Sequence, residues 1–273
     1  MKRRKDAHKG DFGHVLVVAG SPSMLGAAAL TGLSAMRAGA GLTTIAVARS
    51  LNLTLQGKIS NVIMTRPLPE TSRGTVALRA FDLLKKDWTR YSAVALGPGM
   101  TTTPGTVRFV EKMYLECPFP MVVDADALNA LALRKVLGRK ACGQRVLTPH
   151  PGEMARLTGL SKEMIRKDRR AIARKYAKDW GCTVVLKGPG TVVASPDGKV
   201  YVNRTGGPEL ATAGSGDVLT GLVASLMAQG LDEFHSARQG AYLHGLTGDR
   251  LSRQKTRILA TDLIEAFQAP KEK

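Results

Sequence analysis

The stretch VVDADALN at residues 122–129 contains the strand-to-helix transition on which the fold prediction is built. Its first residues continue an apolar, β-branched run that begins at Met121, which is typical of a strand buried on both faces. Asp124 ends this run, and Asp126 stands where a helix beginning at Ala127 would have its N-cap. A buried strand that passes through acidic residues into a helix is one βα unit of a parallel sheet.

The same alternation of short apolar runs and helix-period segments recurs in both directions along the chain. It predicts an α/β fold with a mostly parallel central sheet. Residues 195–198 form a Ser-Pro-Asp-Gly turn between two apolar runs, so antiparallel strands are expected near the end of the chain. No linker or repeat interrupts the pattern, which favours a single domain over residues 1–273. The expected strands are 15–19, 43–47, 93–96, 121–124, 145–148, 183–187, 191–194 and 200–203, and the expected helices are 27–38, 107–115, 127–133, 162–179, 217–229 and 234–251, with one more from about 154.

The composition is that of a globular chain. Of the 273 residues 44% are hydrophobic and 23% are charged, which is too apolar for disorder. No apolar stretch approaches the roughly 18 residues that a membrane span requires, so no membrane association is expected. Cys117, Cys142 and Cys182 are widely spaced and form no CxxC pair, so we interpret them as buried thiols of a protein in the reducing cytoplasm.

A net charge of +18, from 40 basic and 22 acidic residues, favours polyanionic partners. The basic residues gather at 2–5, 162–178 and 250–257. Only 5% of residues are aromatic, and none alternates with these clusters as a base-stacking surface requires. Nucleic acid is therefore disfavoured, and phosphate-bearing small molecules remain.

The segment ATAGSGD at residues 211–217 precedes an apolar helical run at 218–227. Its two glycines allow close approach of backbone N–H groups, and the helix start directs its positive dipole end at the loop. The segment therefore predicts an anion hole, beside which Asp217 is placed to accept the proton of an attacking hydroxyl. An ordinary Gly-rich turn, with Asp217 complementing the helix dipole, is the alternative.

The segment KGPGT at residues 187–191 joins an expected strand to the first strand of the hairpin. A lysine that leaves a strand beside two glycines can reach a nucleotide phosphate. The spacing is not that of a P-loop, so a different nucleotide-binding loop is required. A tight turn with a solvated lysine would explain the same residues without a ligand.

Two further strand ends carry polar side chains. Asp124 finishes a buried strand and is expected to point into the ligand crevice, toward ligand or metal. His150 lies between two prolines in a rigid extended segment that could present its imidazole to a substrate, although a lone histidine is more often structural. Because ligands of open parallel sheets bind beyond the carboxyl ends of the strands, these residues are expected to share one site.

Together, the motifs DADALN, TPHPGE and AGSGD resemble those of the ribokinase-like superfamily, and more closely its branch of ADP-dependent NAD(P)H-hydrate dehydratases. The resemblance runs from about residue 8 to about residue 262. It implies a three-layer αβα fold with nucleotide near the last helices and substrate at the carboxyl edge of the sheet. A ribokinase-like vitamin kinase acting on a hydroxymethylpyrimidine or hydroxyethylthiazole is the alternative, because it would share AGSGD.

The implied reaction is the dehydration of the S-epimer of NAD(P)H hydrate, with ADP as co-substrate and AMP and phosphate as products. Phosphorylation makes sense chemically because phosphate is a far better leaving group than hydroxide, and positioning with charge stabilisation carries phosphoryl transfer. The resemblance assigns Asp217 as the catalytic base and the N–H groups of Ala213, Gly214, Ser215 and Gly216 as the anion hole. It assigns nucleotide contacts to Lys187, Gly188, Pro189, Gly190, Thr191 and Gly216, and substrate contacts to Ala40, Gly99, His150 and Asp217.

The resemblance also implies a metal, a partner and an assembly. Glu153 occupies the last position of the superfamily's Asn-x-x-Glu motif and is expected to hold Mg²⁺ through water, with His150 replacing the asparagine. The amino-terminal epimerase domain of many relatives has no counterpart here, so a separate epimerase is expected. A homotetramer is implied as well. The preference between NADH and NADPH hydrate stays open, and so does the choice between ADP and ATP, since ADP is only implied by the resemblance.

Overall fold

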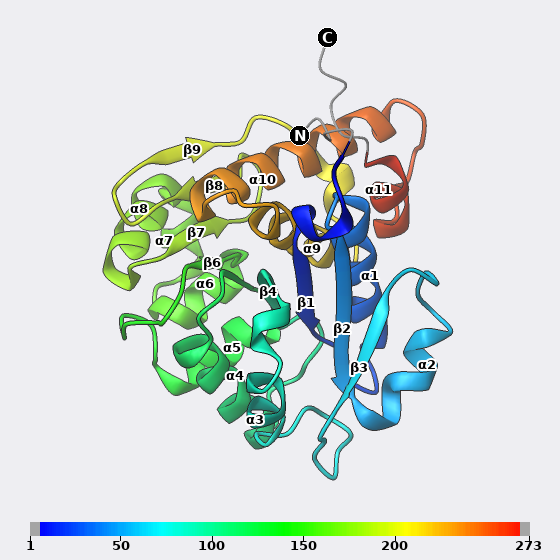
Figure 1. Ribbon diagram of the computed structural model, residues 1–273. Coiled ribbons are helices and arrows are strands. Elements are labelled where there is room, and N and C mark those ends of the chain that lie inside the picture. Colours follow the sequence, from blue (N-terminus) through cyan, green and yellow to red (C-terminus); the bar gives the residue numbers. More distant parts are fainter. Residues whose placement is uncertain (1–5, 268–273) are drawn as a thin grey trace.

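The computed structural model describes residues 6–267 (Figure 1). Within this range nine strands form one sheet in the order β3-β2-β1-β4-β5-β6-β7-β8-β9. All neighbours from β3 to β7 are parallel, and β8 and β9 are antiparallel. The predicted mostly parallel sheet with antiparallel strands near the end is therefore confirmed. The strands are β1 His14–Val18, β2 Leu42–Ala48, β3 Met64–Leu68, β4 Ala93–Leu96, β5 Met121–Val123, β6 Arg145–Leu147, β7 Thr183–Leu186, β8 Val192–Ala194 and β9 Val200–Val202.

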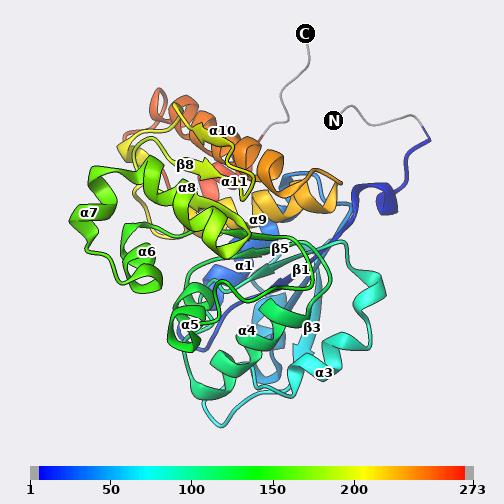
Figure 2. The same ribbon diagram turned by 90° about the vertical axis from the view of Figure 1, so that its left-hand side faces the viewer.

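Helices cover both faces of the sheet. Strand β1 shows why: Val15 and Val17 join a core with residues of α1 and α9, whereas Leu16 and Val18 join a second core with residues of α4 and α5. Alternate side chains of a strand point to opposite faces, so a strand that is apolar throughout needs a layer on each side. Figure 2 shows α9, α10 and α11 on one side of the sheet and α3, α4 and α5 on the other, which confirms three αβα layers. The helices are α1 Leu25–Arg37, α2 Asn52–Gln56, α3 Ala80–Lys85, α4 Pro104–Glu116, α5 Asp126–Arg134, α6 Pro151–Thr158, α7 Lys162–Lys167, α8 Arg169–Trp180, α9 Ser215–Ala228, α10 Glu233–Ser252 and α11 Ala260–Ala266.

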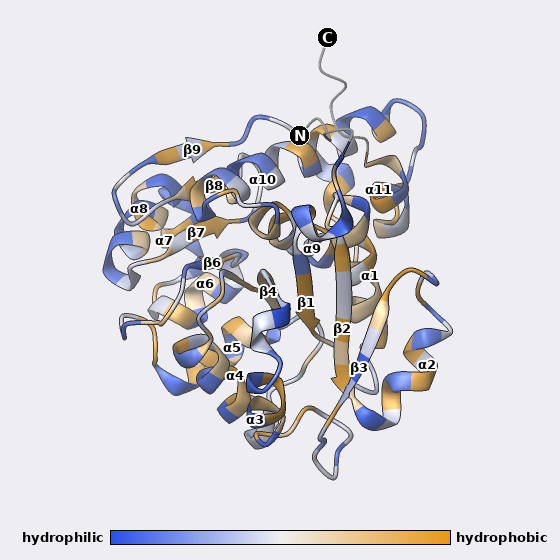
Figure 3. Ribbon diagram, in the orientation of Figure 1, coloured by the Kyte–Doolittle hydropathy of each residue, from blue (hydrophilic) through white to orange (hydrophobic). Residues whose placement is uncertain are grey.

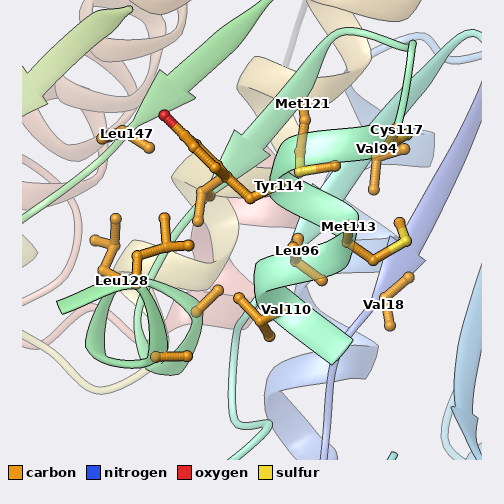
Figure 4. Packing of buried hydrophobic residues seen from close by; sticks show 14 of the residues in the cluster. Val18, Val94, Leu96, Val110, Met113, Tyr114, Cys117, Met121, Leu128 and Leu147 are labelled. Atoms are coloured by element: carbon orange, nitrogen blue, oxygen red, sulfur yellow. The ribbon is translucent and has the colours of Figure 1, made fainter. Parts of the chain in front are cut away.

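Apolar side chains between α4 and the sheet hold the strand ends in place. Val110 and Met113 of α4 lie over Leu96 and Val18, and hydrophobic colour follows the central strands (Figures 3 and 4). Arg145, at the start of β6, is 2% exposed and donates hydrogen bonds to the carbonyls of Tyr114, Cys117, Phe119 and Gln144. The bonds to Tyr114 and Cys117 satisfy carbonyls at the end of α4, so the residue is structural.

The predicted helix 162–179 is wrong as a single element. It breaks at Asp168, whose φ of −143° and ψ of 71° end α7, and whose carboxylate accepts a hydrogen bond from the amide of Ala171 to begin α8. An N-cap aspartate therefore outweighs the continuous helical period. The edge strand β3 was not predicted because it contains Pro67, which an edge position tolerates. The short helices α2, α3 and α11 were not predicted either.

Three smaller expectations have separate outcomes. Cys117 and Cys182 are buried thiols as predicted, but Cys142 is exposed, because it lies in an irregular segment before β6 rather than in the core. The basic cluster at residues 2–5 lies outside the described residues. No helix described between residues 6 and 267 is both long and apolar enough to span a lipid bilayer.

Candidate active site

Four segments meet at the carboxyl edge of the sheet. Asp124 follows β5, Glu153 lies on α6 just after β6, Lys187 follows β7, and Gly216 lies in the first turn of α9. The strands β5, β6 and β7 are neighbours and parallel, so their carboxyl ends lie at one edge. The structure thus brings together motifs that are separated by up to 92 residues, from Asp124 to Gly216.

Lys187 is at the centre of this cluster. Its Nζ lies 2.7 Å from Oδ1 of Asp124 and 3.8 Å from Oε2 of Glu153. Burial alone would lower the pKa of Lys187, but the carboxylates of Asp124, Glu153 and Asp217 raise it above its ordinary value. The ammonium therefore stays charged, and its side chain keeps 19% of its surface exposed to a ligand.

The sequence indicated that Asp124 points into the ligand crevice, but in the structure its carboxylate is held by protein partners. Its carboxylate is almost fully buried, with Oδ1 bound to Lys187 and Oδ2 accepting a hydrogen bond of 2.7 Å from Oγ1 of Thr220. A buried carboxylate with both oxygens occupied is a fixed partner rather than a ligand acceptor. Thr220 was not predicted, and its only signal is a hydroxyl within the apolar run of α9.

Asp126 also differs from its expected role. It is the first residue of α5 rather than its N-cap, and its Oδ2 accepts a hydrogen bond of 2.9 Å from the amide of Thr101. Thr101 and Ala125 both have positive φ, at 63° and 51°. Asp126 therefore holds the loop after β4 against the loop after β5. Each of these loops contains one residue with an unfavourable backbone conformation.

The start of α9 offers free donors. Among the described residues, no acceptor bonds the backbone N–H groups of Ala213, Gly214, Gly216 and Asp217, whereas the amide of Ser215 reaches the carbonyl of Thr212 over 3.3 Å. A Cβ on Gly216 would lie 3.4 Å from Nζ of Lys187, so this turn faces the ammonium. Free amides, a helix dipole and a lysine make the region strongly attractive to phosphate.

Asp217 is half-buried in this first turn. Burial raises its pKa to about 7, and Asp124 and Asp126 add to the rise while Lys187 opposes it. A carboxylate that gains and loses its proton near neutral pH is well suited to act as a general base.

His150 and Glu153 form a reciprocal cap on α6. Nδ1 of His150 accepts hydrogen bonds from the amides of Gly152 and Glu153, and Oε2 of Glu153 accepts one of 2.8 Å from the amide of His150. Nδ1 is thereby unprotonated, and burial, Lys187 and Arg156 lower the pKa of the imidazole. The ring is half-exposed, and its Nε2 lies 3.6 Å from Oε1 of Glu153.

A cavity of about 690 Å³ adjoins these residues and is large enough for a nucleotide. Of the predicted residues, it is lined by His150, Lys187, Gly188, Pro189, Thr191, Ser215 and Gly216. Its far wall was not predicted from the sequence and is formed by Asn203, Thr205 and the loop 206–210, together with Ala241, His244 and Gly245 of α10. Gly245 is the sequence feature that could have indicated this wall. A Cβ at this position would lie 2.3 Å from Oγ1 of Thr205, so only glycine lets the loop lie against α10.

Several predicted residues lie outside this lining, Asp217 and Glu153 among them. Gly190 accepts a hydrogen bond from Arg169, which supports the turn 187–190 from behind, and Ala213 and Gly214 lie in the loop that leads into α9. Gly99 is buried in the loop after β4, where a Cβ would meet the carbonyl of Met24 at 2.7 Å. Ala40 is 2% exposed and precedes β2, at the opposite edge of the sheet from Lys187. The structure therefore does not bring Ala40 to the cavity.

Glu153 fits a magnesium ion held partly through water. Burial raises the pKa of Glu153 to about 7, while Lys187 opposes the rise, so an approaching cation would favour the charged form. Within residues 6–267 no group of three or more His, Cys, Asp or Glu side chains is arranged to hold a metal ion. The donors therefore suit an ion bound by one carboxylate, water and substrate phosphates, which is the usual manner for Mg²⁺.

The class of protein follows from this architecture. A solved structure of a ribokinase-like superfamily protein from Enterococcus faecalis matches 97% of this chain and 88% of that chain, with a TM-score of 0.82 and 24% identity. The fold is therefore the ribokinase-like αβα fold.

The family is more specific. The family described as NAD(P)H-hydrate dehydratase matches residues 15–269, so the chain belongs to this family. It is 47% identical, over 97% of its length, to the bifunctional NAD(P)H-hydrate repair enzyme Nnr of Moorella thermoacetica, of which it spans 50%. It is 41% identical, over 98% of its length, to the ADP-dependent (S)-NAD(P)H-hydrate dehydratase of Neisseria meningitidis, of which it spans 86%. The structure of the ADP/ATP-dependent NAD(P)H-hydrate dehydratase of Bacillus subtilis, co-crystallised with ATP/Mg²⁺, matches with a TM-score of 0.81 and 31% identity, covering 97% of this chain and 91% of that chain.

Proposed function

We propose that the protein dehydrates the S-epimer of NAD(P)H hydrate to NAD(P)H, consuming ADP and releasing AMP and phosphate. The observation that carries this proposal is the position of Asp217. A carboxylate with a pKa of about 7 adjoins free amides and the Lys187 ammonium, so a base and a phosphate site lie side by side. The family membership and the names of the relatives support the choice of substrate.

The proposed reaction has two steps. In the first, Asp217 accepts the proton of the ring hydroxyl, whose oxygen attacks the β-phosphorus of ADP and displaces AMP. In the second, the ring C–O bond breaks and phosphate leaves, a proton on the neighbouring ring carbon passes to water, and the electron pair of that C–H bond restores the double bond. The amides at the start of α9 and the ammonium of Lys187 stabilise the charge on the transferring phosphoryl group.

The remaining residues bind and orient. Lys187 to Thr191 and Gly216 hold the AMP part in the cavity, and His150 and Gly99 contact the hydrated dinucleotide. Mg²⁺, held by Glu153 through water, would neutralise phosphate charge when bound. The predicted contact of Ala40 with substrate stays a prediction, since within a single chain Ala40 lies at the edge of the sheet opposite the cavity.

The proposal extends to the setting of the reaction. We expect a single-domain protein that acts in the cytoplasm as a homotetramer, together with a separate epimerase that supplies the S-epimer. A bifunctional relative supports the link to an epimerase, since it carries more than one repair activity in one chain. Neither nucleic acid nor membrane is part of the proposal.

The decisive experiment follows the reduced-nicotinamide absorbance after mixing protein, Mg²⁺, NAD(P)H hydrate and either ADP or ATP. A dehydratase regenerates the chromophore and releases phosphate in equal amounts. A vitamin kinase would instead phosphorylate a thiazole or pyrimidine alcohol and leave the absorbance flat. Turnover of such an alcohol, with none of the hydrate, would overturn the proposal.

Replacement of the proposed base tests the mechanism directly. We expect Asp217→Ala to lower kcat by about 10²-fold or more, the usual scale for a general base, because it removes the carboxylate that accepts the hydroxyl proton. ADP should still bind, as measured by calorimetry, since the amides and Lys187 remain. A variant with native kcat would refute the role of Asp217.

A further inference from the structure

His244 is a buried histidine on the wall of the nucleotide cavity that has no part in the mechanism above. It lies on α10, is 9% exposed, and lines the cavity together with Ala241 and Gly245. Burial lowers its pKa to about 4, and the nearby Lys187 charge contributes in the same direction. The ring is therefore neutral at physiological pH, with one donor and one acceptor nitrogen.

The contacts of Nε2 determine which nitrogen carries the proton. Nε2 of His244 lies 3.0 Å from the carbonyl oxygen of Ser215 and 3.2 Å from its Oγ. A carbonyl oxygen can only accept, so Nε2 must be the N–H donor, and Nδ1 must carry the lone pair. The bond to the first residue of α9 thus fixes both the tautomer and the orientation of the ring.

Nδ1 has no partner within the described residues. Nδ1 is not fully enclosed by protein atoms, so water or a bound molecule can reach it, and native structures satisfy such acceptors with protein, water or ligand. His244 is an otherwise satisfied residue that lines a cavity of nucleotide size, so its unpartnered acceptor is available to a donor on the bound molecule.

The position of the ring within the cavity narrows the choice of donor. His244 contacts Ser215, whose neighbour Gly216 faces the Lys187 ammonium at the phosphate end of the cavity. In a nucleoside diphosphate the group adjacent to the phosphates is the ribose, which carries two hydroxyl donors. The exocyclic amine of adenine lies beyond the ribose, farther from the phosphates.

We infer that His244 is a nucleotide-recognition residue whose Nδ1 accepts a hydrogen bond from a ribose hydroxyl of the nucleoside diphosphate. This inference rests on the proposed function, because it places the nucleotide in the cavity beside Lys187. His244 would distinguish ribonucleotides from deoxyribonucleotides and would position the sugar, not the reacting phosphate.

Two substitutions separate the two nitrogens. In His244→Gln the side-chain amide can replace Nε2 as donor to Ser215 but offers no acceptor at the Nδ1 position. In His244→Asn the side chain is shorter and offers an acceptor near the Nδ1 position, but it loses the donor to Ser215. His235→Gln is the matched control, since His235 lies on the same helix, is exposed and pairs with Asp232.

The measurement is the Kd of ADP, 2′-deoxy-ADP, 3′-deoxy-ADP and inosine diphosphate, by calorimetry on the full chain. We expect His244→Gln to weaken ADP binding by about five- to tenfold, the usual effect of one lost hydrogen bond. His244→Asn should retain more of the ADP affinity but melt at a lower temperature, and His235→Gln should bind as the native protein does. Either 2′-deoxy-ADP or 3′-deoxy-ADP, whichever lacks the bonded hydroxyl, should bind the native protein more weakly than ADP by a similar factor. In His244→Gln that nucleotide and ADP should bind equally, as a double-mutant cycle requires.

The outcomes are distinct. Equal ADP affinity of native protein and His244→Gln would overturn the inference while leaving the proposed function intact. Inosine diphosphate lacks the exocyclic amine. If it binds the native protein more weakly than ADP, and only this difference in affinity disappears in His244→Gln, the donor is the amine and the ribose assignment is wrong. Failure of the native protein to bind ADP at all would remove the proposed function and this inference together.

Discussion

At the residue scale, the site depends on how a few charges share one buried edge of the sheet. Three carboxylates, those of Asp124, Glu153 and Asp217, surround the single ammonium of Lys187. Burial raises the pKa of Glu153 and of Asp217 to about 7; the charge of Asp124 adds to the rise, and Lys187 opposes it. A buried carboxyl group of this kind suits a base that works near neutral pH, and the unpaired acidic charge leaves room for a second cation.

The raised pKa of Asp217 predicts a trade between activity and stability. Its value moves from 3.8 to about 7 on folding, so the folded state binds more protons than the unfolded state between these values, and stability falls as pH rises through that window. We expect Asp217→Asn to raise the free energy of unfolding by about 1–3 kcal/mol at pH 8 and to change it little at pH 4. Urea denaturation at both pH values is the measurement, and an equal effect at both would contradict it.

Replacement of Lys187 is expected to affect both ADP binding and the stability of the fold. We expect Lys187→Ala to weaken ADP binding at least tenfold and to destabilise the fold by about 3 kcal/mol, because it leaves the buried Asp124 without its counter-charge. Calorimetry with ADP and chemical denaturation measure the two effects. Lys199→Ala, in the exposed turn between β8 and β9, is the control and should change neither.

At the element scale, α9 connects the chemistry to the fold. Its first turn provides the free amides and Asp217, while its apolar body lies against α1, α10 and the sheet. Gly221 is the closest approach, where a Cβ would lie 2.2 Å from the carbonyl oxygen of Thr31 on α1. The position of the anion site therefore depends on how closely two helices meet behind the sheet.

This contact can be tested by a single methyl group. We expect Gly221→Ala to destabilise the protein by about 2 kcal/mol or more through overpacking, and to lower turnover because the start of α9 shifts. Gly26→Ala in α1, where no atom lies within 4 Å of the added Cβ, should stabilise slightly, by up to about 1 kcal/mol, as helix propensity requires. Equal stability of the two variants would show that the α1–α9 contact is not tight.

For the molecule as a whole, the net charge of +18 complements the proposed substrates, which are polyanions. A positive potential raises the rate of encounter with such substrates and is screened by salt. We expect kcat/KM for the hydrate and ADP to fall several-fold between about 50 and 500 mM KCl, with kcat nearly constant. Sucrose at matched viscosity is the control, and a kcat/KM that does not respond to salt would show that the charge serves another purpose.

The chain also shows how far sequence reasoning reaches at each scale. The apolar runs around Val17 and Val122 predicted strands of the central sheet, and the glycines before Asp217 predicted a helix start open to anions. The edge strand with Pro67 and the break at Asp168 were missed, because edge position and capping compete with local period. The far wall of the cavity, with Asn203 and His244, carried no recognisable motif.

Strand and helix periods are local and strand ends in a parallel sheet share one edge, so the residues alone predicted a mostly parallel α/β sheet and the motifs at its carboxyl edge, while the resemblance to a known family implied the three layers. Only the tertiary structure decided the partners. It paired Lys187 with Asp124, 63 residues away, and Asp124 with Thr220, 96 residues away, and it oriented His244 so that Nδ1 has no partner among residues 6–267. Such contacts depend on which strands are neighbours and how closely helices pack, and neither is encoded within a few residues of the side chains involved.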